Sequence, residues 1–301
     1  MKKFLTTLTI ATFVMALVSC QDRDTDVIEE PRVPVLDMAL NQPFATLAMG
    51  GSLTLTTTII PEQATNRTVF WHSTNPSVAT VANGNITALS AGFTNIVAIT
   101  EDGNKRDTSA IMVHFIEETD SWDTEVLGMA SFATNRIWVV GSQVWSDAVQ
   151  TDFCSNKTTF DGGIAYGMNA ESRIDCRSNP NRNGDLFTWL AVYELREKLC
   201  PHPWRVPTMQ EFRTLDTALG GTGWAQDNPP HRNLYFAWGA EFNGFSRADG
   251  TFDGTGVYYW SQSNISIGLG SAFTIFRDGM VLAFPHFPTA YGISLRCVRD
   301  N

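Results

Sequence analysis

The sequence predicts an all-β sandwich followed by a domain of mixed α and β structure. Residues 33–115 contain short runs in which apolar and polar residues alternate, with turn residues about every ten positions. Residues 116–301 contain the segments with the clearest helical periodicity. This second segment is also rich in aromatic residues and glycine and holds four of the five cysteines.

The chain begins with a segment typical of an export signal. Lys2 and Lys3 give a positive start, and the apolar run that follows is interrupted only by threonines. The run is too short to span a membrane comfortably. Its end, Leu17-Val18-Ser19-Cys20, resembles a bacterial lipobox, which implies removal of residues 1–19 and lipidation of Cys20. The alternative is a plain secretory signal that ends by chance at a cysteine.

Residues 20–32 are acidic and lack hydrophobic periodicity, which predicts a flexible tether. Acidic residues directly after a lipidated cysteine also resemble the signal that sends Bacteroidetes lipoproteins to the outer face of the outer membrane. The resemblance implies an outer membrane lipoprotein that faces the cell exterior and contacts the membrane through its lipid only. A tether is often acidic without such a signal, so that alternative stays open.

The composition excludes one class of function. The formal net charge is −10, and loss of Lys2 and Lys3 with the leader would make it more negative. Nucleic-acid binding needs clustered cations to neutralise phosphates, so we expect no nucleic-acid partner. Charged residues make up 17% of the chain, and this low content together with many aromatic residues is typical of an exported β-rich protein.

The strands of the predicted sandwich follow from alternation. Apolar residues recur at every second position in runs of five to eight residues that favour β-branched types, and these positions include Leu53, Leu55, Thr57, Ile59, Val69, Trp71, Ile86, Ala88, Ile96 and Ala98. Turn signals separate the runs, namely Gly50-Gly51, Pro61, Asn75-Pro76, Asn83-Gly84, Ala91-Gly92 and Asp102-Gly103.

Nearly the whole of this segment resembles a known family. Residues Pro61–Asn66, residues Val69–Val81 with Trp71 and the Asn75-Pro76-Ser77 turn, and residues Gly84–Gly92 resemble the bacterial Ig-like domain of group two. The resemblance implies that Trp71 is the buried aromatic residue of the sandwich. It also implies a stalk or an adhesive module, and we expect the stalk role.

The second segment contains two predicted helices. Asp185 is a candidate cap for a helix through Leu199, because the apolar residues from Leu186 to Tyr193 fall on one face. The second helix begins at a capping box formed by Thr208 and Glu211. Its buried stripe is Phe212, Leu215 and Leu219, and Gly220-Gly221 ends it. Strands are expected at Val257–Ser261, Ala272–Phe276, Met280–Phe284 and Ile293–Val298.

Three motifs of this segment resemble the Fibrobacter major paralogous domain family. They are Leu199–Thr208, which contains Cys-Pro and Trp-Arg-Val-Pro-Thr, then Tyr258–Ser263 with its Tyr-Trp-Ser block, and the terminal Arg296-Cys297-Val298. The resemblance is strong from about Asp185 to the end and weaker over residues 120–184. That family in turn looks like the C-type-lectin-like fold of formylglycine-generating enzymes, an analogy of fold that says nothing about function.

The cysteine count predicts two disulfides. Four cysteines remain after Cys20, an even number in an exported chain, and sequence alone permits three connectivities. A metal site is the rival interpretation, but it would need closer cysteine spacing or neighbouring histidines. The family resemblance implies that Cys200 pairs with Cys297, which leaves Cys154 to pair with Cys176.

No catalytic signature is present in the sequence. His202, His231 and His286 are scattered, no serine lies in a Gly-x-Ser-x-Gly elbow, and no glycine cluster follows a strand as a phosphate site requires. We therefore expect no enzymatic activity and no cofactor.

The candidate ligand-binding residues are three aromatic residues and two carboxylates. Trp238, Tyr258 and Tyr259 are of a type that stacks on sugar rings when exposed, although most such residues pack against their neighbours. Asp249 and Asp253 lie four residues apart in a predicted turn and could bind Ca²⁺, although hairpin turns use Asp-Gly routinely.

Two functional hypotheses follow. The first is a non-enzymatic surface protein, in which an Ig-like stalk presents a lectin-like domain to a glycan, a protein or matrix. The second is a cysteine-dependent enzyme related in fold to the formylglycine-generating oxidases, with Cys297 as a reactive thiol. The state of the thiols distinguishes them, because a structural Cys200–Cys297 bond excludes a free catalytic thiol.

Overall fold

The computed structural model describes residues 31–116, 130–132, 136–151, 154, 157–158, 164–165, 173–180, 184–224, 231–266, 268–278, 280–282 and 285–301. The predicted signal, the lipidation site at Cys20 and most of the tether lie outside these residues. Residues Val33–Asn301 form one compact unit. Within the described part, no helix combines the length and the apolar character that crossing a membrane requires.

The N-terminal segment consists of nine strands. They are β1 (Asp37–Leu40), β2 (Phe44–Ala48), β3 (Ser52–Thr54), β4 (Thr57–Ile60), β5 (Val69–Ser73), β6 (Ala79–Ala82), β7 (Asn85–Ala88), β8 (Gly92–Thr100) and β9 (Arg106–Ile116). Strands β5, β8, β9 and β2 lie in one sheet, β3, β7 and β6 form a second, and β1 pairs with β4. All pairs are antiparallel except β2 with β9, which is parallel.

Alternating side chains of these strands form the core of the segment, as the sequence pattern predicts. One cluster is centred on Ile86, Ile96 and Ile111, which are fully buried, and a second contains Met38 and Ile59. Trp71, which the family resemblance implied to be buried, is only half-buried, although it packs against both clusters and joins them. The Asn75-Pro76-Ser77 sequence forms the predicted turn into β6, where the Ser77 hydroxyl donates to the Asn75 side chain at 2.6 Å.

In the part of the second segment that the structure describes, short strands are combined with four helices. The helices are α2 (Trp189–Glu194), α3 (Arg196–Leu199), α4 (Met209–Ala218) and α5 (Arg232–Ala237). The strands are β10 (Ala130–Phe132), β11 (Arg136–Val140), β12 (Gln143–Thr151), β13 (Ile164–Ala165), β14 (Arg173–Ile174), β15 (Cys176–Ser178), β16 (Asp185–Phe187), β17 (Phe245–Ser246), β18 (Phe252–Asp253), β19 (Gly256–Ser266), β20 (Leu269–Phe276), β21 (Val281–Leu282), β22 (His286–Pro288), β23 (Gly292–Ile293) and β24 (Arg296–Asp300).

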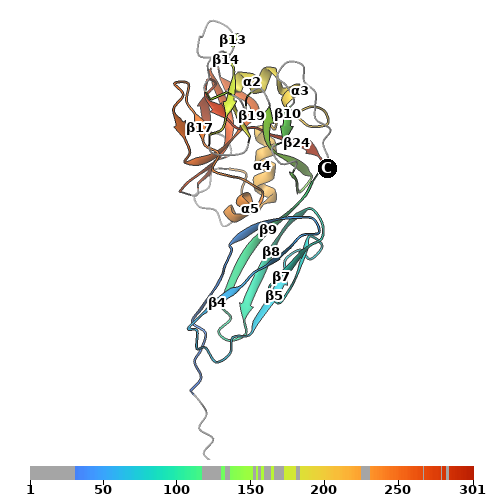
Figure 1. Cartoon of the computed structure of the whole chain (residues 1–301), viewed down its shortest axis with the longest axis vertical. Helices are drawn as coiled ribbons and strands as arrows, with labels where there is room; N and C mark the ends of the chain where they lie inside the picture. Colours follow the sequence, from blue (N-terminus) through green and yellow to red (C-terminus); the bar gives the residue numbers. More distant parts are fainter. Residues whose placement is uncertain are drawn as a thin grey trace, which may run out of the picture. The chain divides into compact units, whose positions relative to one another are not determined.

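The strands of this segment that the structure describes form three further sheets and extend the first one, and the smallest of the three is the pair β13–β14. The order β15-β16-β23-β17-β18 makes a five-stranded sheet, and β19, β20, β21 and β22 make another. Strands β10, β12, β11 and β24 continue the sheet of β9. The chain is therefore mostly β, with its helices concentrated in the second segment (Figure 1).

The predicted start of the first helix is wrong. Asp185 does not cap it, because Asp185–Phe187 form strand β16, which pairs with β15 and β23. The buried Asp185 carboxylate instead accepts a hydrogen bond from Thr151 N–H at 2.7 Å. Thr188 is the actual N-cap, and the predicted single helix is divided at Leu195 into α2 and α3.

The second predicted helix is confirmed in detail. Thr208 caps α4, and the reciprocal hydrogen bonds of the capping box to Glu211 are both present. Phe212, Leu215 and Leu219 are buried as predicted. Gly220 adopts a φ of +101°, a conformation that favours glycine and ends the helix.

Strand β9 belongs to both segments. Its residues pair with β8 and β2, and its last three residues also pair with Arg136–Trp138 of β11 (Figure 1). Ala110 and Met112 of β9 lie in the same hydrophobic cluster as Trp138 and Phe212. The predicted division between residues 115 and 116 therefore falls within a strand that hydrogen-bonds on both sides of it.

Candidate functional site

The three aromatic residues that the sequence analysis proposed as ligand-binding candidates lie in the core. Trp238 is fully buried, and Tyr258 and Tyr259 are each 2% exposed. Neighbouring residues of a strand point to opposite faces, so Tyr259 joins one hydrophobic cluster and Tyr258 the other. Stacking on a ligand requires an exposed ring face, which none of the three offers. The expectation that they bind ligand is therefore corrected.

Two of these rings surround a buried cation. The Arg296 guanidinium lies 3.7 Å from the centroid of the Trp238 ring and 5.6 Å from that of Tyr259. It donates to Ser146 O at 2.6 Å and to Trp238 O at 3.1 Å, and burial lowers its pKa. These aromatic residues thus stabilise a charge inside the core.

The two candidate calcium ligands close local turns. Asp249 Oδ1 accepts from Thr251 N–H at 2.9 Å and from its hydroxyl at 2.7 Å. Asp253 does the same with Thr255 and also pairs with Arg247 at 3.2 Å. Hydrogen bonds from these threonines lower the pKa of both carboxyl groups. Within the described residues, no group of three or more His, Cys, Asp or Glu side chains is arranged to hold a metal ion.

Both cysteine pairs are joined in the structure. Cys200 is bonded to Cys297 and Cys154 to Cys176, with Cα–Cα distances of 5.6 Å and 5.4 Å. All four residues lie in one buried cluster and are at most 3% exposed. The pairing that the family resemblance implies is the one that the structure contains, and no thiol of these four is available as a nucleophile.

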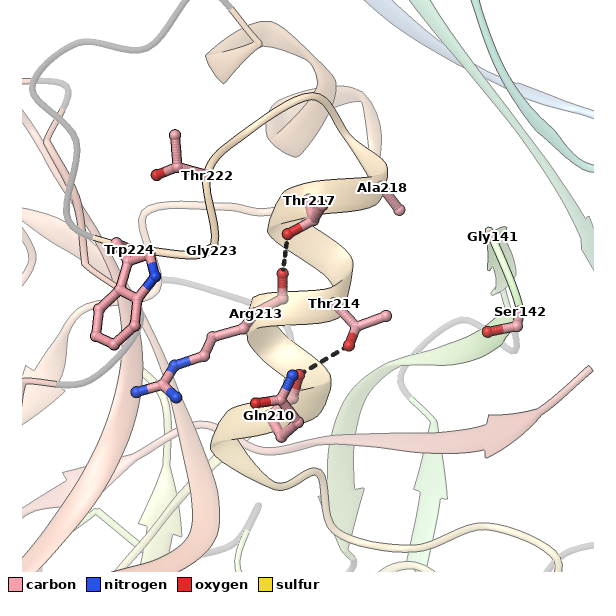
Figure 2. Close-up of a pocket in the computed structure, with 10 residues that line it drawn as sticks. All are labelled: Gly141, Ser142, Gln210, Arg213, Thr214, Thr217, Ala218, Thr222, Gly223 and Trp224. Atoms are coloured by element: carbon pink, nitrogen blue, oxygen red, sulfur yellow. Dashed lines mark hydrogen bonds between the residues drawn. The ribbon is translucent and has the colours of Figure 1, made fainter.

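The outer face of helix α4 is the floor of a surface trough that the sequence did not indicate. Phe212 and Leu215 face the core, so Gln210, Thr214 and Thr217 face outward. The hydroxyl of Thr214 donates to Gln210 O, and that of Thr217 to Arg213 O, both at 2.9 Å (Figure 2).

Two loops form the walls of this α4 trough. On one side lie Thr222, Gly223 and Trp224, and on the other lies the Gly141-Ser142 turn between β11 and β12 (Figure 2). The trough has a volume of about 500 Å³, within the range of small-ligand sites. Trp224 is 57% exposed, and the Arg213 guanidinium lies 4.6 Å from the centroid of its ring.

A buried carboxylate holds the wall that carries Trp224. Asp216, on the core side of α4, accepts from Gly223 N–H at 2.7 Å and lies 2.9 Å from His231 Nε2, and the Tyr235 hydroxyl donates to it as well. Burial by itself raises the pKa of Asp216, but these three hydrogen bonds outweigh it and the pKa lies below its ordinary value. Burial also raises the pKa of Tyr235 well above its ordinary value.

The close packing at Asp216 also explains Gly221. A Cβ at this position would lie 2.3 Å from the Asp216 carboxylate, which is closer than atoms can approach. The glycine pair that ends α4 therefore has a second role, because it lets the chain pass over the carboxylate on its way to Trp224. The available sequence signal for Trp224 was its position in this glycine-rich loop just after a capped helix.

Comparison with known proteins identifies the N-terminal segment. Residues 34–111 match the sequence model of the family described as bacterial Ig-like domain (group 2). This segment is a bacterial Ig-like domain. The Ig-like domain is 38% identical over 82 residues to an uncharacterised protein of Clostridium acetobutylicum and 36% identical over 83 residues to an Ig-like virion protein of Serratia phage KSP90. Each match covers 27% of this chain, but only 20% and 32% of those proteins.

Solved structures give weaker matches. Domains 4 and 5 of the S-layer protein SbsC match at 20% identity, covering 27% of this chain and 53% of that one, with a TM-score of 0.24. An intimin mutant of enterohaemorrhagic O157:H7 matches at 12% identity, covering 88% of this chain and all of that one, with a TM-score of 0.23. Scores this low support no conclusion about the second segment.

Proposed function

We propose that the chain is a non-enzymatic surface protein, in which the Ig-like domain supports a second domain that binds an extracellular ligand. The observation that most supports this is strand β9, which ends the Ig-like domain and pairs with β11 of the second segment. A stalk must transmit position and load to the part that it supports. A strand that pairs with strands of both domains does so better than a flexible linker.

The proposed domains are residues 33–115 and 116–301, preceded by the signal at 1–19 and the tether at 20–32. We assign the second domain to the Fibrobacter major paralogous family and, through it, to the C-type-lectin-like fold. Contacts between its motifs support the assignment. Arg205 exchanges two backbone hydrogen bonds of 2.9 Å with Val298, and Trp260 N–H donates to Ser294 O at 2.9 Å, so the three sequence motifs meet in space.

The proposed location is the outer face of the outer membrane, reached through lipidation of Cys20. Two disulfides support a compartment outside the reducing cytoplasm. The Serratia phage relative is a virion protein by name, which fits an Ig-like domain that works outside the cell.

The alternative, a cysteine-dependent enzyme, would require Cys297 to act as a thiolate. Cys297 is fully buried and bonded to Cys200, and the described residues contain no other cysteine outside a disulfide. The structure therefore favours the binding protein over this enzyme.

The proposed function is tested with the unlipidated full chain, made as Cys20→Ala and labelled with a fluorophore. It is presented to immobilised mucins, polysaccharides, matrix proteins and whole host cells, with an equally labelled unrelated acidic protein as control. Saturable binding to at least one of these surfaces, above the control, is the expected result. Absence of binding to all of them would overturn the proposal, and a cysteine that reacts rapidly with iodoacetamide at neutral pH would then favour the enzyme.

A further inference from the structure

We propose that the α4 trough binds a saccharide, with a sugar ring stacked on Trp224 and its hydroxyl groups bonded to the outward side chains of α4. This inference rests on the proposed function, for which it names the site and the class of ligand. The Gly141-Ser142 turn bounds the ligand on the other side (Figure 2).

Exposure of Trp224 is the first step of the argument. Among the tryptophans that the structure describes, Trp224 alone is exposed, whereas six others in the second segment are at most 5% exposed. Because the exposed ring lines the trough, a ligand that enters the trough can contact it. The flat apolar face of Trp224 is complementary to the C–H face of a pyranose ring.

Hydrogen-bonding capacity of the trough is the second step. The Gln210 carboxamide can both donate and accept. The hydroxyls of Thr214 and Thr217 donate hydrogen bonds to carbonyl groups of the helix, so their oxygens can only accept hydrogen bonds from a ligand in the trough. A sugar presents hydroxyl groups that donate and accept around its rim, which matches this mixed set.

The charge of the trough is the third step. Among the residues that the structure describes, its lining contains one cation, Arg213, and no carboxylate, although the chain as a whole has a net charge of −10. The acidic surface as a whole attracts basic peptides, but the trough does not share this negative charge. The trough suits neutral or carboxylate-bearing saccharides.

Rigidity of the walls is the fourth step. The capping box fixes the start of α4, and the Asp216 carboxylate fixes the loop that carries Trp224 through Gly223. The opposite wall also touches the helix, because a Cβ on Gly141 would lie 3.5 Å from that of Ala218. A site formed before the ligand arrives loses little conformational entropy on binding. Asp216 is thus a positioning residue.

The chain offers a matched control for Trp224. Tyr193 on α2 is 43% exposed and also has an arginine over its ring, with the Arg196 guanidinium 5.1 Å from the centroid. Removing either ring deletes an exposed aromatic–arginine pair, but only Trp224 borders the trough. Gln210→Ala provides a second trough variant that keeps the ring and places a good helix former on the exposed face of α4.

The test measures binding of the full chain to an array of neutral and uronic-acid-containing saccharides, followed by titration of the best ligand. Trp224→Ala is expected to weaken binding at least about tenfold, which corresponds to about 1.4 kcal/mol. Gln210→Ala is expected to weaken it several-fold, and Tyr193→Ala to leave it within about twofold. Circular dichroism melting of each variant confirms that it folds.

Two outcomes overturn the inference and leave the proposed function standing. One is saccharide binding that both trough variants retain at full strength, which would place the site elsewhere. The other is binding to a protein surface with none to any saccharide, which would reject the ligand class. Absence of binding to every surface would instead reject the proposed function itself.

Discussion

The Cys200–Cys297 disulfide should stabilise the second segment more than Cys154–Cys176 does. The first bond closes a loop of 97 residues and the second a loop of 22 residues. In the chain-entropy treatment these loops correspond to about 4.7 and about 3.4 kcal/mol at 25 °C. The difference of about 1.3 kcal/mol arises in the unfolded chain, because the longer loop is restricted more by its cross-link.

The perturbation is paired substitution by alanine, Cys200→Ala with Cys297→Ala and Cys154→Ala with Cys176→Ala. Alanine avoids a buried hydroxyl, and all four positions lie in the same hydrophobic cluster, so the cavity costs are similar and nearly cancel in the comparison. For a segment of this size, loss of the longer cross-link should lower the melting temperature by roughly 10 to 20 °C.

The assay is urea unfolding of the full chain followed by far-ultraviolet circular dichroism and tryptophan fluorescence. Non-reducing peptide mapping of the starting protein verifies both pairings. The reasoning is refuted if the Cys154–Cys176 variant is destabilised as much as the other, or if reduction of the wild type leaves its unfolding curve unchanged. A peptide that links Cys200 to Cys154 or Cys176 would refute it directly.

Three further predictions follow from the sequence and the structure. Cys20→Ala should abolish lipidation, so the variant partitions into the aqueous phase of a detergent extraction, whereas retention in the detergent phase would contradict the lipobox. Asp216→Asn should destabilise the chain at neutral pH by about 2 kcal/mol, because it weakens hydrogen bonds to a buried carboxylate. The pKa of Asp216 is lower in the folded chain than in the unfolded one, so its contribution to stability is present above the unfolded pKa of about 3.9 and is lost as pH falls through the folded value. Asp216→Asn should therefore make stability depend less on pH at the acid end of the curve. An unchanged pH dependence there would count against this. Residues 33–115, expressed alone, should unfold cooperatively but at lower temperature than in the full chain, because they lose the pairing of β9 with β11; absence of a cooperative transition in calorimetry would reject this domain boundary.

The Ig-like domain was predictable because its signals are local and agree with one another. Alternation selects the core positions, and turns such as Asn75-Pro76-Ser77 divide the strands where the structure divides them. Helix α4 was predictable for the same reason, since its capping box, buried stripe and terminal glycine lie within 14 residues of sequence, Thr208 to Gly221.

The start of α2 was not predictable from local pattern. Asp185 and Thr188 are both acceptable N-caps, and Leu186 fits the helical stripe. The choice between them depends on β15, which lies just before β16 in the chain, and on β23, which lies near its end, because both strands pair with β16. Helical periodicity does not report this sheet pairing, which takes residues that the periodicity assigned to the helix.

The candidate site was mispredicted because residue type does not report burial. Tyr258 and Tyr259 were candidates for stacking on a ligand by residue type alone, yet they lie in a strand that is buried on both faces. Trp224 differs from them only by its position after Gly220-Gly221, and its exposure depends on where the loop passes over Asp216.

The aromatic content of the second segment has a structural explanation that sharpens the functional one. Ordering the backbone costs about 1–2 kcal/mol of conformational entropy per residue. A segment of short strands and irregular connections has few regular hydrogen bonds to set against this cost, so large buried side chains and disulfides must offset it. Trp138, Trp145 and Trp260 are fully buried, and the fully buried Trp238 ring packs against the Arg296 guanidinium. Because the core accounts for these rings, aromatic abundance by itself indicates nothing about a ligand. The one exposed tryptophan that the structure describes, Trp224, packs against Arg213 at the trough and not in the core, and this is why binding is expected to depend on it.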